Sequence, residues 1–100
     1  MDKIDLAYAP ASELVDLIAS KALSPVELME ATLARLDDLN PKLNAVCTPT
    51  PELAMEGARK AEQAVMTGDA LGPLHGVPTT IKDLTSTKGI RTMSGSYVHA

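Results

Sequence analysis

The sequence predicts an α/β chain in which three helices come first and a loop with short strand segments follows. Apolar residues recur at helical spacing in three segments between residues 12 and 67, and Pro or Gly lies at most of the boundaries of these segments. After residue 68 that spacing is lost, Gly and Pro become frequent, and the β-branched run 79–81 follows.

The first eleven residues are expected to form an irregular lead-in that ends at Pro10. Ser12 is a suitable N-cap for a first helix of about two turns, because its hydroxyl can accept a hydrogen bond from an unpaired backbone N–H. The apolar residues of this helix share one face: Leu14, Val15, Leu17 and Ile18. Lys21–Leu23 is then expected to break the helix.

Ser24, Pro25 and Glu27 predict the start of a second helix. Ser at the N-cap, Pro at the first helical position and Glu at the third form a capping box. Apolar residues at helical spacing continue to about residue 39: Val26, Met29, Leu33 and Leu36. Asn40–Pro41 is expected to end this helix, because proline disfavours helical backbone at the residue before it.

A short strand is expected at Leu43–Thr48, and a third helix follows it. Thr50 at the N-cap and Pro51 at the first position predict its start, and Gly68 predicts its end at about residue 67. Small residues at helical spacing let this helix approach a sheet or another helix closely: Ala54, Gly57, Ala58, Ala61 and Ala64.

The segment Gly72–Asp83 reads Gly-Pro-Leu-His-Gly-Val-Pro-Thr-Thr-Ile-Lys-Asp. Its glycines and prolines predict a rigid, turning loop, and Thr79–Ile81 predicts a short strand that ends at Lys82. A lysine that a strand places in an apolar setting loses hydration, and this loss favours the neutral, basic form. The alternative is a solvated pair of Lys82 with Asp83, and the spacing alone favours this alternative.

The same segment closely resembles the lysine-bearing segment of the amidase signature family, whose members hydrolyse amides with a Ser–Ser–Lys triad. The likeness continues through Lys88–Thr92 into Met93-Ser94-Gly95-Ser96, which resembles the family's Gly-x-x-Thr-Thr-x-Gly-Ser loop with Met93 in place of the second Thr. The resemblance implies that Lys82 is the catalytic lysine. It also implies a set of residues that shape the site: Gly72, Pro73, Gly76, Pro78, Asp83, Ser94, Gly95 and Ser96.

The resemblance implies a single large domain with a mixed sheet covered by helices on both faces, of which this chain matches the amino-terminal part. Sequence of the Gly-Gly-Ser-Ser-Gly-Gly type, which carries two triad members in the family, does not occur in residues 1–100. We therefore expect these residues to be the amino-terminal part of one such domain, with the lysine but without the serines. Alone, the chain is expected to be inactive.

The expected reaction is hydrolysis of a small-molecule carboxylic amide to a carboxylate and ammonia or an amine, without a cofactor. The loop sequence favours a free-standing amidase, and the alternative within the family is the glutaminase (the A subunit) of a tRNA-dependent amidotransferase. An alternative from another class is a non-catalytic helical interaction or dimerisation module. The two amino-terminal helices are expected either to form a homodimer or to cover one edge of the core.

Composition and charge exclude several other classes. A net charge of −4 provides no basic surface for nucleic acid, and a single Cys excludes an internal disulfide and a cysteine-rich metal site. No secretory signal follows Met1, and no apolar run is long enough to span a bilayer. We expect a cytoplasmic protein without a metal, nucleic-acid or membrane partner.

Three other residue types invite a chemical role. His75 is not expected to bind a metal, because the sequence holds one other His and no carboxylate lies at ligand spacing. Asp83 is expected to lie opposite Lys82 and to anchor the local backbone, since side chains alternate along a strand. Ser94 and Ser96 lack the Gly-x-Ser-x-Gly turn of a nucleophile, so a structural or substrate-contacting role is expected for them.

Overall fold

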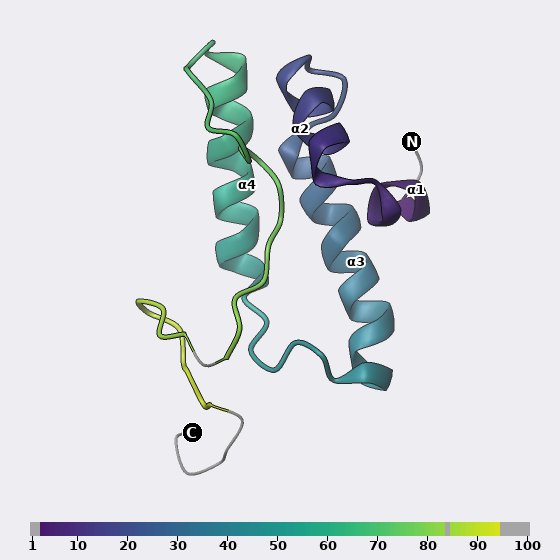
Figure 1. The fold of residues 1–100 in the computed structure, drawn as a ribbon, viewed down its shortest axis with the longest axis vertical. Coiled ribbons are helices and arrows are strands. Elements are labelled where there is room, and N and C mark those ends of the chain that lie inside the picture. The colour runs from purple at the N-terminus through teal and green to yellow at the C-terminus, as the bar shows by residue number, and fades with distance from the viewer. Residues whose placement is uncertain (1–2, 84, 95–100) are drawn as a thin grey trace.

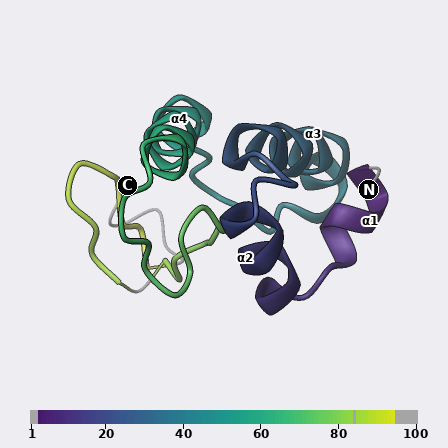
Figure 2. The same cartoon turned by 90° about the horizontal axis from the view of Figure 1, so that it is seen from above.

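The computed structural model describes residues 3–83 and 85–94, which form four helices followed by a long loop (Figure 1). The helices are α1 (Lys3–Tyr8), α2 (Ala11–Ala19), α3 (Pro25–Leu43) and α4 (Pro51–Met66). α3 and α4 run side by side in opposite directions and form one layer, while α1, α2 and the loop after α4 form a second layer (Figure 2).

The amino-terminal segment is helical, so the expected irregular lead-in is wrong. α1 packs against α3 and contributes Leu6, which is buried in the same cluster as Leu14 and Leu28. A helix of six residues is too short to show a periodic apolar pattern or to be stable by itself. Its stability therefore comes from this tertiary contact.

α2 buries Leu14 and Ile18, two residues of the face expected from the sequence. Its N-cap is Pro10 rather than Ser12, and Ser12 is exposed. The Pro10 carbonyl accepts hydrogen bonds from the N–H groups of Glu13 and Leu14, each at 3.1 Å. A proline can occupy this position because the N-cap residue has extended backbone and needs no N–H donor.

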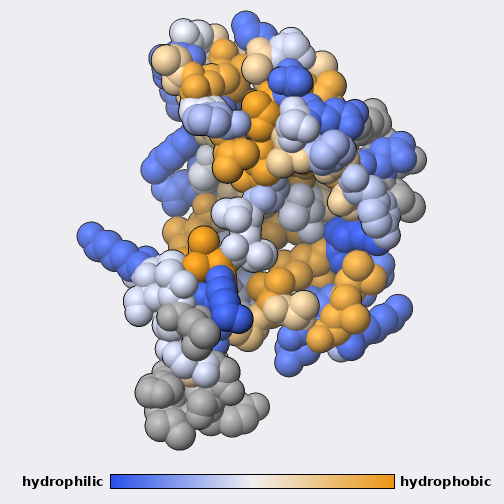
Figure 3. Space-filling view, viewed as in Figure 1, coloured by the Kyte–Doolittle hydropathy of each residue, from blue (hydrophilic) through white to orange (hydrophobic). Residues whose placement is uncertain are grey.

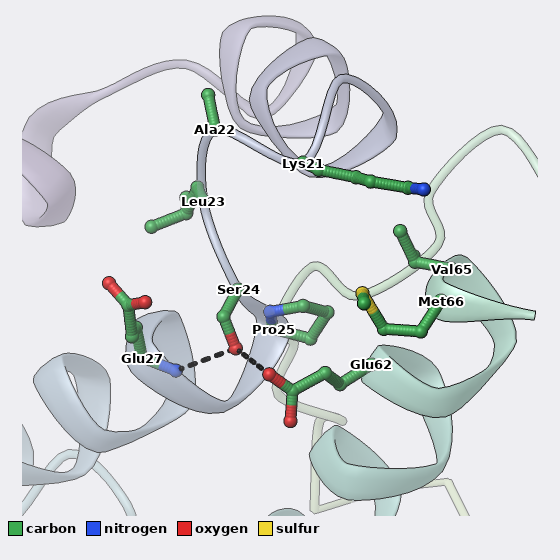
Figure 4. Close-up of a pocket in the computed structure, with 9 residues that line it drawn as sticks. All are labelled: Lys21, Ala22, Leu23, Ser24, Pro25, Glu27, Glu62, Val65 and Met66. Atoms are coloured by element: carbon green, nitrogen blue, oxygen red, sulfur yellow. Dashed lines mark hydrogen bonds between the residues drawn. The ribbon is translucent and has the colours of Figure 1, made fainter.

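The start of α3 is as expected. The Ser24 hydroxyl oxygen accepts hydrogen bonds from the N–H groups of Val26 at 3.0 Å and Glu27 at 3.4 Å. The hydroxyl also donates to the Glu62 carboxylate of α4 at 2.8 Å (Figure 4). One side chain therefore caps α3 and connects it to α4.

The expected end of this helix at Asn40–Pro41 is wrong, because α3 continues through Pro41 to Leu43. Pro41 cannot donate to the Asp37 carbonyl, but Asp37 is exposed, so water can take that place. The helix ends at Asn44, whose backbone is left-handed with φ 48° and whose N–H donates to the Asn40 carbonyl at 2.7 Å. Asparagine is one of the few residues that adopts this conformation readily.

The strand expected at Leu43–Thr48 is also wrong. The Asn40 side chain donates to the Val46 carbonyl and accepts from the Val46 N–H, both at 3.0 Å. Since a side-chain amide satisfies both backbone groups of Val46, this segment needs no neighbouring strand. Cys47 is exposed in this connection and does not belong to the core.

α4 begins with Pro51 at its first turn and is followed by Gly68 at φ +77°, as the sequence predicts. The Thr50 side chain makes no capping hydrogen bond. Within the expected face of small residues, Ala58 is buried while Gly57 is exposed with open space around it. The face that packs on α3 is therefore narrower than the sequence suggests.

The core between the two layers is aliphatic. Its buried residues are Leu6, Leu14, Ile18, Leu23, Leu28, Ala31, Ala58 and Val65. In α3 the buried face contains Leu28 and Ala31 rather than the expected set at Val26 and Met29. Apolar residues occur on more than one side of α3, so the spacing alone does not select the face that the other helices cover.

The structure shows the expected order of helices first and a loop afterwards, but it does not show the expected strands or mixed sheet. Within the described residues the β-type pairing is one isolated bridge between Thr87 and Ile90. Thr79–Ile81 lies outside any paired strand. A strand requires a neighbour with which it exchanges backbone hydrogen bonds, and the described part of the chain provides none here.

Candidate active site

Residues 72–77 form the turning part of the lysine-bearing loop. The His75 N–H donates to the Gly72 carbonyl at 3.2 Å, and the Val77 N–H donates to the Leu74 carbonyl at 3.1 Å. These two bonds close successive tight turns. Gly72 and Pro73 are exposed, so they shape the backbone without contributing to the core.

Gly76 brings this loop into contact with the helices. Its backbone is left-handed, with φ +81°. A Cβ at this position would lie 3.0 Å from Ile18 Cδ1 of α2 and 3.1 Å from Pro25 Cγ of α3. Glycine is therefore required here both for the backbone conformation and for the space available.

His75 connects the same loop to α4. Its Nε2 lies 2.9 Å from the Ala61 carbonyl oxygen. A carbonyl can only accept, so Nε2 carries the hydrogen and donates it. The described residues contain no group of three or more potential metal ligands. His75 is thus a structural contact of the loop, and no signal in the sequence identifies a helix carbonyl as its partner.

The chain around Lys82 is open to solvent. Thr79, Thr80, Ile81 and Lys82 are all exposed, and the Ile81 side chain retains 57% of its surface accessible. The Thr85 N–H donates to the Lys82 carbonyl at 3.0 Å, so the backbone turns directly after the lysine. The apolar setting that would desolvate this lysine is not provided by the described residues.

Asp83 brings two of the predicted site segments together. Its carboxylate accepts a hydrogen bond from the Met93 N–H at 2.9 Å, and its backbone carbonyl accepts one from the Ser94 N–H at 3.0 Å. The side chain therefore anchors local backbone, and Lys82 is held beside the loop that contains Ser94. The role of Asp83 in shaping an active site stays a prediction.

The segment between these contacts turns at Thr87–Ile90. The Ile90 N–H donates to the Thr87 carbonyl at 3.3 Å, and Gly89 supplies the left-handed backbone at φ +80°. Ser94 is exposed and has φ 53°, which is uncommon for a residue with a side chain. Gly95 and Ser96, which the sequence also places in the site, lie outside the described residues.

Lys82 lines neither of two hollows on the surface of the described residues. The first, of about 130 Å³, lies between residues 21–25 and α4, next to Ser24 and Glu62 (Figure 4). The second, of about 260 Å³, is lined mainly by apolar side chains of α1, α2 and α3 and by Val77 and Pro78. Apolar surface is visible on the face that carries the loop (Figure 3).

None of the helices in the described part of the chain combines the length and apolarity needed to cross a membrane.

Comparison with known proteins gives consistent matches. The family model described as Amidase matches residues 27–100. The A subunit of glutamyl-tRNA(Gln) amidotransferase from Alkalilimnicola ehrlichii is 47% identical over 85 residues, which cover 85% of this chain and 17% of that protein. The protein of the same name from Carboxydothermus hydrogenoformans is 40% identical over 95 residues, which cover 95% of this chain and 20% of that protein.

An acylamidase of Rhodococcus erythropolis is also 40% identical over 95 residues, with 95% of this chain and 20% of that protein covered. The chain thus spans about a fifth of the length of the curated relatives it matches. No solved structure matches it.

Proposed function

Because this chain belongs to the amidase signature family, we propose that the protein hydrolyses a carboxylic amide and that Lys82 is the base of its Ser–Ser–Lys triad. In this proposal residues 1–100 are the amino-terminal part of one domain, and the two serines belong to sequence outside this range. The helices and the lysine-bearing loop would cover and join a mixed sheet that the remaining sequence completes.

The proposed mechanism requires a neutral lysine. An uncharged Lys82 amine accepts a proton from a middle serine, which in turn takes the proton of the nucleophilic serine. The nucleophile attacks the amide carbonyl, the proton returns to the departing nitrogen, and water hydrolyses the acyl-enzyme. A lysine that is exposed in these 100 residues needs apolar neighbours from the remainder of the domain to favour this neutral form.

The observation that supports this proposal most directly is the exposed segment Thr79–Lys82, which is not part of a paired strand. A self-contained interaction module would be expected to cover an apolar side chain such as Ile81, and to avoid an open extended edge. Here Ile81 is 57% exposed beside the lysine. An uncovered segment of this kind suits one that pairs with strands of a larger sheet, so the non-catalytic module is the weaker interpretation.

The first test is the intact mass of the purified gene product. We expect a mass several times the 10.5 kDa of these 100 residues, and a mass near 10.5 kDa would contradict the proposed domain. Ammonia or amine release from simple carboxylic amides is then measured for this product. Lys82→Ala should abolish turnover, whereas Lys60→Ala, which removes an exposed lysine on α4 paired with Glu56, should not. Full activity of the Lys82→Ala variant would refute the assignment.

A second function is supported by the printed names of several relatives. Proteins named as the A subunit of glutamyl-tRNA(Gln) amidotransferase reach 47% identity over 85 residues, and over 95 residues one of them is 40% identical, as the acylamidase is. In this alternative the protein releases ammonia from glutamine and works with partner subunits. Glutamine hydrolysis that depends on co-purified subunits would favour it, and hydrolysis of simple amides by the isolated protein would favour the free-standing amidase.

A homodimer through the amino-terminal helices is the remaining association that we propose to test. Leu14 and Ile18 of α2 and Leu28 of α3 are already buried within the chain. A dimer would therefore use the outer faces of these helices. Sedimentation equilibrium of the gene product distinguishes a dimer from a monomer.

A further inference from the structure

The strongest connection near Lys82 is made by the residue that follows it. Asp83 binds one short segment twice, through its carboxylate to the Met93 N–H at 2.9 Å and through its carbonyl to the Ser94 N–H at 3.0 Å. Asp83 is half-buried, so the carboxylate bond is partly shielded from water. Hydrogen bonds from N–H to an ionised acceptor are stronger than those between neutral groups.

These two bonds close the loop between residues 83 and 93 at its base. The closed loop carries its own turn at Thr87–Ile90, and the Thr85 N–H additionally holds the Lys82 carbonyl at 3.0 Å. The backbone of Lys82 is therefore fixed on its carboxyl side by the Asp83 contacts. On its amino side, Thr79–Ile81 is exposed and lies outside any paired strand.

We infer that Asp83 is a positioning residue, which holds Lys82 in register with the loop at Met93 and Ser94. This inference rests on the proposed function of Lys82 as the base. Asp83 acts through the hydrogen bonds that its oxygens accept. In this inference the negative charge of Asp83 has no direct role at the Lys82 amine, and the substitutions below test this point.

Two substitutions distinguish a role of the Asp83 hydrogen bonds from a role of the Asp83 charge. In Asp83→Ala the acceptor for the Met93 N–H is lost, whereas the Asn side chain of Asp83→Asn keeps an acceptor oxygen and removes the charge. Asp69→Ala is the matched control, because Asp69 is exposed in the loop directly after α4. Far-UV circular dichroism of each variant checks that the helices are retained.

The first measurement is amide hydrogen exchange at Met93 and Ser94 in the purified gene product. Exchange should be faster by about tenfold in Asp83→Ala, only slightly faster in Asp83→Asn, and close to wild type in Asp69→Ala. Unchanged exchange at Met93 in Asp83→Ala would overturn the inference without any reference to catalysis.

The second measurement is amide hydrolysis by the gene product. Asp83→Ala should lower kcat by about 100-fold with little change in KM, because a small displacement of a reacting group is enough for such a loss. Asp83→Asn should restore kcat and leave its pH profile unshifted. A shifted profile in Asp83→Asn, or a normal kcat in Asp83→Ala, would overturn the inference. A fully active Lys82→Ala variant would instead overturn the proposed function, whatever the Asp83 variants show.

Discussion

Replacing Gly76 by Ala tests whether the lysine-bearing loop packs on the helices. Two costs add at this position. An alanine in left-handed backbone costs about 1 kcal/mol relative to glycine. The new methyl would also lie 3.0 Å from Ile18 Cδ1 and 3.1 Å from Pro25 Cγ. Ile18 is 1% exposed and Pro25 is buried at the start of α3, so neither can move aside freely. Overpacking of this kind costs about 1–3 kcal/mol.

The expected loss is therefore about 2–4 kcal/mol in the free energy of unfolding, measured by urea denaturation with far-UV circular dichroism. Gly89→Ala is the matched control, because Gly89 has nearly the same φ of +80° but no atom within 4 Å of an added Cβ. It should lose only the backbone part, about 1 kcal/mol. Equal losses in the two variants would show that the loop does not contact Ile18 and Pro25 in solution, and would refute this account of the loop.

Two further predictions concern the helix connections. Ser24→Ala should lower the free energy of unfolding, measured by thermal unfolding, by about 1 kcal/mol, since it removes the cap of α3 and the hydrogen bond to Glu62. The control is Ser12→Ala, which should stay within about 0.5 kcal/mol of wild type because Ser12 is exposed and caps nothing. Equal losses of stability in the two variants would contradict the cap. Asn40→Ala should cost about 1–2 kcal/mol and should speed hydrogen exchange of the Val46 N–H, and unchanged exchange there would contradict the contact.

The starts of α3 and α4 could be predicted from the sequence because their signals are local. Ser24 and Pro25 act on backbone groups within one turn of themselves, and Pro51 needs no partner at all. The incorrect predictions concern features that depend on the surroundings of a residue instead of on its local sequence. α1 depends on the contact of Leu6 with the core, and the helix continues through Pro41 at a place where Asp37, whose carbonyl loses its donor, is exposed.

The strand at Leu43–Thr48 failed for a related reason. Its composition suits an extended backbone, but a strand is defined by its neighbour, and here the Asn40 side chain provides the hydrogen bonds of Val46. A propensity rule cannot anticipate that a side chain six residues earlier would take the place of a strand. Thr79–Ile81 also has suitable composition, and it lies without a neighbouring strand in the described residues.

In the candidate site, too, the features that local sequence predicts differ from those that depend on distant parts of the chain. The motif predicts that Lys82 is the catalytic lysine, and the contacts of His75 with Ala61 and of Asp83 with Met93 set the path of the chain around it. None of these contacts surrounds the lysine amine with apolar groups, because Lys82 is exposed. A base that must be neutral near pH 7 depends on such surroundings. In the mechanism that we propose, the described contacts set the path of the chain at Lys82, and the surroundings that favour a neutral amine would be groups that pack over the exposed face of Thr79–Lys82.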